Sequence, residues 1–365
     1  MLFVKNDDLK VGMRLAKPIY NKKGVLLYDR NSKLTQQGID SVQNFGLIGL
    51  FILEPAEPIP PMSEEDMEFE RFQTVAVFQI MDELEYLVYM KKPSKMSVIV
   101  ADIIKHYGRL NKKINFVQNL RSKEDYVYKH SLNVGMLCAM MTHVLNLRLE
   151  EQNEIVTAGV VHDIGKLTAP QKLREKGMAL SREERIEMDR YEKAGAAIVE
   201  NAFNSHPNIK RTMVYTNKLL EDFRKGVLPV GGTGKLIMGA RVLMVAETFD
   251  IMTAMNDYRE PSSEISALKY LMANPGIFDP KVVEALVKSI NFLTNGCTIE
   301  LSNGEKGLVI AANDDDVLKP MVLQFSDNSI IDLARNGKGI EITDVMKTMD
   351  NRCVIDKEAL KGVNV

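Results

Sequence analysis

The sequence has little of several features that would assign it to a common functional class. Its 47 basic and 49 acidic residues give a formal net charge of −2, and no basic run is long enough to bind a phosphate backbone. We therefore expect no polymeric nucleic acid partner. No apolar run approaches the ~20 residues of a membrane span, and Asp7 and Asp8 come too early for a signal peptide. These observations favour a cytoplasmic protein without a membrane partner.

Cysteine and histidine are also scarce. The 3 cysteines, at positions 138, 297 and 353, form an odd set without the spacing of metal ligands, which suits a reduced compartment. The 5 histidines lie at positions 106, 130, 143, 162 and 206. A search for a histidine-based site is therefore short.

The most informative motif is His162 followed by Asp163 within the apolar segment 160–167. An unpaired carboxylate that enters a core loses its hydration at a cost of several kcal/mol. A divalent cation offsets that cost for the carboxylate and the imidazole together. The motif therefore predicts a metal site whose other ligands come from elsewhere in the chain.

His130 is the best placed of the remaining histidines. Residues 126–145 have apolar side chains at helical spacing, and His130 lies on their stripe. His143 follows thirteen positions later, which at about 100° per residue turns it roughly 140° away. We expect His130 to face inward and His143 to face elsewhere.

A further predicted helix, residues 236–255, carries Glu247 and Asp250 beside its apolar side. The residues taken together predict a helical bundle that holds one cation through His130, His162, Asp163 and Glu247, with Asp250 as a reserve or supporting acid. The alternative is that His130 is a hydrogen-bonded core histidine and that basic side chains neutralise the acids.

These residues, in this order, resemble the HD superfamily of metal-dependent phosphohydrolases, and in particular its HD-GYP branch. The resemblance covers about residues 111–294 and is carried by residues 128–134, 162–167 and 240–259. It implies a mainly α fold, in which a helical-bundle HD domain lies between small β-rich N-terminal and C-terminal modules. Members of the branch typically hydrolyse cyclic di-GMP at a centre of two or three iron or manganese ions.

The sequence departs from the HD-GYP pattern at several ligand positions. Tyr191 stands where the family has a metal-binding histidine, and residues 217–219 replace its His-His-Glu. Residues 226–229 replace the Gly-Tyr-Pro loop, and Glu247 replaces a metal-binding aspartate. The departures predict at most one divalent metal ion, with Fe or Mn favoured.

Other residues have weaker roles in this interpretation. Lys166 is expected to neutralise phosphate charge, although a solvated cation at a helix end just past Gly165 is an equal alternative. Arg241 is a weaker phosphate candidate, and His206 is a possible rescue ligand in a polar loop. Residues 231–236 are rejected as a phosphate-binding loop, because Leu236 replaces the required Ser or Thr.

The pattern along the chain divides it into five parts. Residues 25–28 and 15–20 flank a turn and predict a hairpin, whereas period-two segments at 298–301, 308–311, 321–325, 330–333 and 340–342 predict C-terminal strands. The expected parts are a β-rich module at 1–54, a proline-rich linker at 55–63, a helical connector at 64–110, the HD-GYP-like domain at 111–294, and a β module with a tail at 295–365.

Two functions agree with these observations. The first is a metal-dependent phosphodiesterase in signalling, with Asp163 and Lys166 in the catalytic centre and cyclic di-GMP as the substrate that the resemblance implies. The second is a catalytically inactive nucleotide sensor or protein-docking module that keeps the fold. The amphipathic residues 64–107 need an apolar surface to cover them, and either the metal-binding domain or a second subunit would supply it. A homodimer is therefore compatible with both functions.

Overall fold

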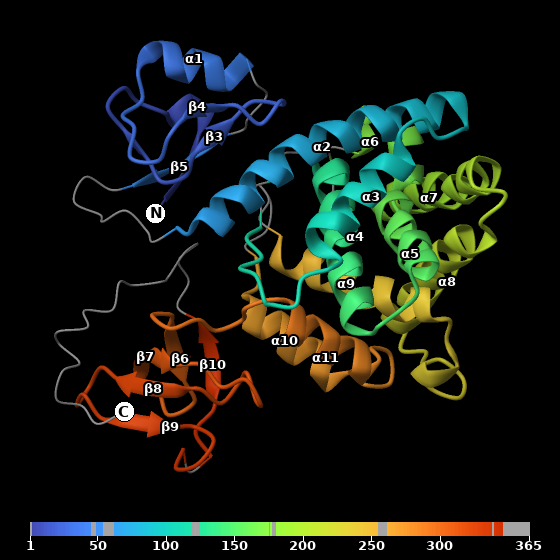
Figure 1. Cartoon of the computed structure of the whole chain (residues 1–365). Helices are drawn as coiled ribbons and strands as arrows, with labels where there is room; N and C mark the ends of the chain where they lie inside the picture. Colours follow the sequence, from blue (N-terminus) through green and yellow to red (C-terminus); the bar gives the residue numbers. More distant parts are fainter. Residues whose placement is uncertain are drawn as a thin grey trace. The chain divides into compact units, whose positions relative to one another are not determined.

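A computed structural model describes residues 2–44, 49–53, 62–118, 121, 125–174, 176, 180–254, 261–337 and 339–345. The chain forms two compact units. One comprises Phe72–Ile290 and is helical, and the other comprises Met1–Arg71 with Asn291–Val365 and contains the β-sheets. The predicted mainly α fold with a small β module towards each end is confirmed (Figure 1).

The helical unit consists of a series of helices. Their bounds are α2 (Glu64–Met90), which begins in the other unit, α3 (Met96–Tyr107), α4 (Tyr126–Val144), α5 (Leu149–Val161), η2 (Ile164–Thr168), α6 (Gln171–Arg174), α7 (Arg182–Ala202), α8 (Pro207–Arg224), η4 (Thr233–Lys235), α9 (Met238–Thr253), α10 (Glu264–Ala273) and α11 (Pro280–Ser289). The two helices predicted at 126–145 and 236–255 correspond to α4 and α9. Residue 255 lies outside the described part of the chain.

Helix α4 forms the centre of this unit because it is apolar on nearly all sides, as expected for a buried helix. It packs against α3, α5, α9 and α11 (Figure 1). Gly135 and Gly159 allow α4 and α5 to approach closely: a Cβ on Gly135 would lie 2.8 Å from Val160 Cγ2. The two helices run antiparallel, so the end of α5 lies beside the first turns of α4.

Side-chain caps define where several of these helices begin. The buried carboxylate of Glu83 accepts hydrogen bonds from the backbone N–H groups of Ser94, Lys95 and Met96 at 2.7, 2.7 and 3.0 Å. It thereby satisfies donors that the first turn of α3 leaves without a helical partner. Ser181 caps α7 in the same way, by accepting from the N–H of Glu184.

The β modules are antiparallel. In the N-terminal part, β1 (Leu2–Lys5), β5 (Gly49–Leu53) and β2 (Arg14–Leu15) form a sheet in the order β1-β5-β2, next to helix α1 (Gln36–Asn44) and the short turn η1 (Asn6–Asp8). The predicted hairpin is present as β3 (Ile19–Tyr20) and β4 (Leu26–Tyr28), which pair with each other.

The C-terminal sheet has the order β10-β6-β7-β8-β9. Its strands are β6 (Thr298–Leu301), β7 (Lys306–Ala311), β8 (Met321–Gln324), β9 (Ile330–Asp332) and β10 (Ile342–Val345). Each overlaps or adjoins a segment where the sequence alternates between apolar and polar residues, because one face of the sheet is buried. Ile299, Leu301 and Val309 lie on that buried face.

The glycine-rich segment between α8 and α9 does not have the setting of a phosphate-binding loop. Residues 225–237 are all described, and within them the only regular element is the 3-10 turn η4, without a strand before it. Gly231 and Gly232 have φ angles of 81° and 77°, which suit a loop and which other residues rarely adopt. The sequence-based rejection of this segment agrees with the structure.

Candidate metal centre

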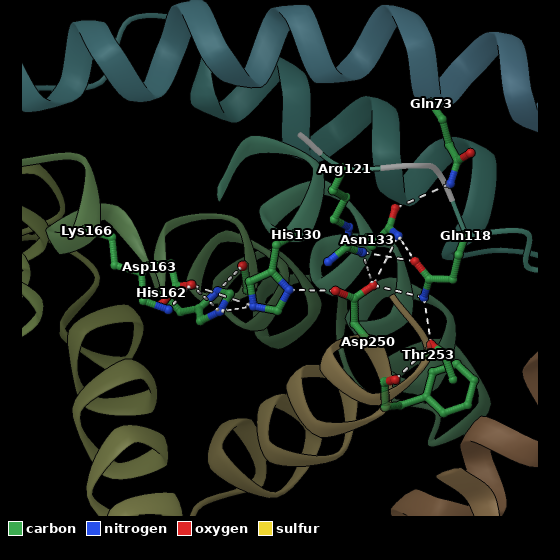
Figure 2. Close-up of polar contacts among 12 residues, drawn as sticks. Gln73, Gln118, Arg121, His130, Asn133, His162, Asp163, Lys166, Asp250 and Thr253 are labelled. Atoms are coloured by element: carbon green, nitrogen blue, oxygen red, sulfur yellow. Dashed lines mark hydrogen bonds and ion pairs between the residues drawn. The ribbon is translucent and has the colours of Figure 1, made fainter. Parts of the chain in front are cut away.

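Three of the proposed metal ligands lie together in the helical unit (Figure 2). His130 projects from the second turn of α4, and His162 and Asp163 directly follow α5. The Nε2 atoms of the two histidines are 3.1 Å apart. Asp163 Oδ2 lies 3.7 Å from Nε2 of His130 and 3.8 Å from Nε2 of His162. All three side chains are buried, with 1%, 3% and 6% of their surface exposed. Their donor atoms thus form a small triangle inside the protein.

The other nitrogen of each imidazole contacts an acceptor. His130 Nδ1 lies 2.6 Å from Asp250 Oδ2, and His162 Nδ1 lies 2.7 Å from the carbonyl oxygen of Gly159. A carboxylate and a carbonyl only accept, so each Nδ1 carries the hydrogen. Burial lowers the pKa of His130, which favours its neutral form. In neutral rings the two Nε2 lone pairs therefore face each other, an arrangement that a shared cation stabilises.

Asp250, the reserve or supporting acid that the sequence predicts, lies at the centre of a polar network (Figure 2). Its Oδ1 accepts hydrogen bonds from Arg121 Nη2 at 2.5 Å and from Gln118 Nε2 and Asn133 Nδ2 at 3.1 Å each. Burial acts to raise the pKa of Asp250, but Arg121 and the hydrogen bond from His130 hold it below its usual value. Asp250 therefore stays ionised and fixes the orientation of His130.

Arg121 is a buried cation, with 1% of its surface exposed. Besides Asp250, its Nη2 donates to Gln118 Oε1 at 2.9 Å. Its guanidinium carbon lies 5.4 Å from the ring centroid of Tyr126, whose ring in turn stacks on His130 with 5.7 Å between centroids. This cation–π contact and the stacked rings hold Tyr126 beside the metal-site imidazole.

Lys166 contacts the carboxylate of the predicted metal site. Its Nζ lies 2.6 Å from Asp163 Oδ2, and 28% of the lysine side chain is exposed. Burial acts to raise the pKa of Asp163, yet Lys166 and the two imidazoles hold it below its usual value. Burial acts to lower the pKa of Lys166, but the charges of Asp163 and Glu192 raise it above its usual value. A charged ammonium group thus borders the donor triangle.

The sequence predicts that Gly165 ends a helix, and this prediction is wrong. Helix α5 ends at Val161, His162 is its C-cap, and residues 164–168 continue as the 3-10 helix η2. Gly165 is needed for another reason, because a Cβ there would lie 2.7 Å from the Cα of Glu192 on α7. A Cβ on Gly195 would lie 2.7 Å from the backbone nitrogen of Gly165. The two glycines let η2 and α7 pack backbone against backbone.

Glu247, the fourth proposed ligand, projects from α9 one turn before Asp250. It lies outside the group of three described residues whose donor atoms are all within 4.8 Å of one another. Its Oε2 is nevertheless buried and has no hydrogen-bond partner among the described residues. A buried carboxylate oxygen without a donor is costly, and a cation is one group that satisfies it.

The remaining candidates lie elsewhere. His143 is half-buried and contacts Asn111, as its helical position predicts. His206 is exposed before α8 and pairs with Glu154 at 3.5 Å, so it is not part of the donor triangle. Arg241, the weaker phosphate candidate, forms an ion pair with Asp279 at 2.9 Å. Tyr191 packs in a cluster with Ala169, Leu173 and Met188.

Sequence reasoning missed the residues that support His130. Asn133 follows His130 by three positions on the same buried helix, so its burial gives a signal that could have been found. Gln118 and Arg121 precede α4 and belong to none of the described helices, and no periodicity predicts that they turn towards α9. Glu192 is also a neighbour that the sequence does not mark.

A family model described as "HD domain" matches residues 110–282. The matched residues include the paired His162 and Asp163 and also His130. Residues 110–282 therefore form an HD domain. None of the described helices of the HD-domain protein is long and apolar enough to cross a membrane.

Curated proteins provide further relatives of the HD-domain chain. It is 23% identical over 256 residues to a cyclic di-GMP phosphodiesterase of Pseudomonas aeruginosa, a match that covers 66% of this chain and 58% of the relative. It is 28% identical over 154 residues to the cyclic di-GMP phosphodiesterase response regulator RpfG of Xanthomonas campestris, covering 42% and 40%. A 3'3'-cGAMP-specific phosphodiesterase of Vibrio cholerae is 26% identical over 160 residues, covering 44% and 30%. The chain thus matches 30–58% of the length of these relatives.

Proposed function

We propose that this protein is a phosphodiesterase that uses one divalent cation, held by His130, His162, Asp163 and Glu247. The observation that carries the proposal is the pair of Nε2 atoms 3.1 Å apart, each with its hydrogen on the opposite ring nitrogen. Two ligands at about 2.1 Å from one metal ion accommodate such a separation. The partnerless Oε2 of Glu247 supports its place as the fourth ligand.

The donor set of two imidazoles and two carboxylates suits iron or manganese, which we propose as the metal. When bound, the cation supplies Lewis acidity that activates water and polarises a phosphoryl oxygen. Asp250 holds His130 in the tautomer that offers Nε2. Lys166, which lies partly exposed beside Asp163, binds a non-bridging phosphate oxygen and offsets its charge.

The substrate that we propose is a cyclic dinucleotide, with cyclic di-GMP favoured. Three relatives from three genera are named for phosphodiesterase activity on cyclic di-GMP or 3'3'-cGAMP. The proposal of a single metal rests on this chain's own residues: Tyr191 is half-buried in an apolar cluster, and Asn217 and Lys218 on α8 replace histidines of the HD-GYP pattern.

The test combines metal content with turnover. Anaerobically purified wild-type protein is expected to contain about one Fe or Mn per chain by elemental mass spectrometry and to hydrolyse cyclic di-GMP to a linear product. Asp163→Ala is expected to lose both the metal and the activity. His206→Ala is the matched control, because this exposed histidine lies outside the donor triangle.

Two results would contradict the proposal. Equal turnover by the wild type and Asp163→Ala would end the enzymatic interpretation. A wild type that binds no metal under several metal supplements would leave the HD domain as a binding or docking module.

A further inference from the structure

Glu192 lies next to the proposed centre but has no assigned role. Its Oε1 is 3.9 Å from Lys166 Nζ, whereas Asp163 Oδ2 is only 2.6 Å from the same nitrogen. Lys166 is therefore hydrogen-bonded to Asp163, and Glu192 is too distant for a hydrogen bond to it. The carboxyl group of Glu192 remains available to a substrate that binds at Lys166.

The position of Glu192 is fixed by the backbone. Gly165 in η2 and Gly195 in α7 are in direct contact, and a Cβ on Gly165 would come within 2.7 Å of the Cα of Glu192. The first turn of η2 also carries Lys166. Because no side chain separates the two elements there, α7 places Glu192 at a defined distance from Lys166 and from Asp163 beyond it.

The surroundings of Glu192 raise the pKa of its carboxyl group above the usual value. Burial raises the pKa of Glu192. The charges of Asp163, which lies just before η2, and of Asp189 on α7 act in the same direction. Lys166 and Arg185 oppose the shift only in part. The side chain keeps 30% of its surface exposed, so it can exchange protons with solvent. A partly buried carboxyl with these properties suits a proton donor.

We propose that Glu192 is the general acid of the hydrolysis, a role that rests on the proposed function. The oxygen of the attacking water forms a bond to phosphorus, and the ester P–O bond on the opposite side breaks. The proton of the Glu192 carboxyl group passes to the departing alkoxide oxygen. One proton of the attacking water is released to solvent and the other stays on the new phosphate oxygen, and the Glu192 carboxylate takes up a proton from solvent before the next cycle.

The test compares two phosphodiesters that differ in their need for an acid. The sugar alkoxide that leaves cyclic di-GMP must be protonated, whereas the nitrophenolate that leaves bis(4-nitrophenyl) phosphate departs without a proton. Glu192→Gln in the full-length protein is expected to lower kcat for cyclic di-GMP by roughly 10²-fold or more. We expect a much smaller loss for bis(4-nitrophenyl) phosphate.

Two further readouts separate an acid from a structural residue. The alkaline fall in the wild-type pH–rate profile for cyclic di-GMP should be absent in Glu192→Gln, and the metal content per chain should be unchanged. Glu192→Asp should recover part of the lost rate. Glu187→Gln, an exposed change on the same helix, is the matched control and should behave as the wild type.

The possible outcomes distinguish the two proposals. Equal losses on both substrates, or a loss of metal in Glu192→Gln, would overturn the assignment of Glu192 while leaving the proposed function intact. Hydrolysis of neither substrate by the metal-loaded wild type would overturn the proposed function and this assignment with it. A selective loss on cyclic di-GMP with unchanged metal content would support both.

Discussion

Asp250 Oδ2 lies 2.6 Å from His130 Nδ1, and this contact determines which nitrogen of His130 is free to bind a metal. The same carboxylate accepts three further hydrogen bonds at Oδ1, from Arg121, Gln118 and Asn133. All the groups around Asp250 in this network are therefore donors, and a carboxylate is the one side-chain group that satisfies them from both sides.

We expect Asp250→Asn to weaken metal binding although the side chain keeps its size. If the amide oxygen of the substituted side chain faces His130, its NH₂ group meets the three donors that Oδ1 accepts from in the wild type. If the amide is turned the other way, its NH₂ group meets the hydrogen on His130 Nδ1. In either orientation two donors face each other. Loss of such a supporting hydrogen bond typically costs about 10–100-fold in metal affinity. Titration against a metal-binding chelator measures the change.

Asp279→Asn is the control for this experiment. Asp279 is another buried aspartate, but it pairs with Arg241 and caps α11. Its substitution should lower stability without changing metal affinity. If both variants lose the same affinity, the effect comes from general destabilisation and not from the orientation of His130.

A second prediction concerns Arg121, the buried partner of Asp250. Arg121→Met removes the charge but retains much of the length, so Asp250 is left in the core without its guanidinium. Removal of one partner from a buried ion pair typically costs about 3–5 kcal/mol. Urea unfolding in the presence of a chelator should show this loss. Arg148→Met, at an exposed ion pair with Glu151, should have little effect, and a similarly small change at Arg121 would contradict the argument.

Acid should destabilise the apo protein through Asp250. Its pKa is held below the usual value in the folded state, while the unfolded chain has a value of about 3.9. The unfolded state therefore binds more protons as pH falls below about 4, and this group alone removes up to ~1.4 kcal/mol of stability per pH unit. The contribution is fully present at neutral pH. Asp250→Asn should show a shallower decline between about pH 4 and 2 in denaturant titrations, and equal slopes would contradict this.

Much of the fold is predictable from periodicity, because apolar residues recur at helical spacing in α4 and α9 and at alternate positions in the C-terminal strands. The pairing of His130 with His162 is also accessible, since both are polar residues in strongly apolar segments and so require a partner. Gln118 and Arg121 are different. They precede α4 outside the described helices, and only the tertiary packing against α9 brings them to Asp250.

The sequence marks Gly165 as structurally important but predicts the wrong role for it. A glycine after a helix usually indicates a C-cap, but here the helix ends four residues earlier and the glycine serves a contact with α7. That contact depends on Gly195, thirty positions later, and no local pattern encodes such a pair. The same limit applies to Glu192, whose place beside Lys166 follows from this packing.

At the contact between Gly165 and Gly195, helix propensity and packing should change the stability of a Gly195→Ala variant in opposite directions. Gly195→Ala should stabilise an isolated helix by about 1 kcal/mol, but its Cβ would lie 2.7 Å from the backbone nitrogen of Gly165 and 2.8 Å from its Cα. Since backbone cannot move aside as a flexible side chain can, we expect a net destabilisation of about 1–3 kcal/mol. We also expect a lower turnover, because η2 carries Lys166.

Ala194→Gly, an exposed change one residue away, is the control. It should lose only the contribution of helix propensity to stability and keep the wild-type turnover. A Gly195→Ala protein that is more stable than the wild type would show that η2 and α7 do not pack at this distance.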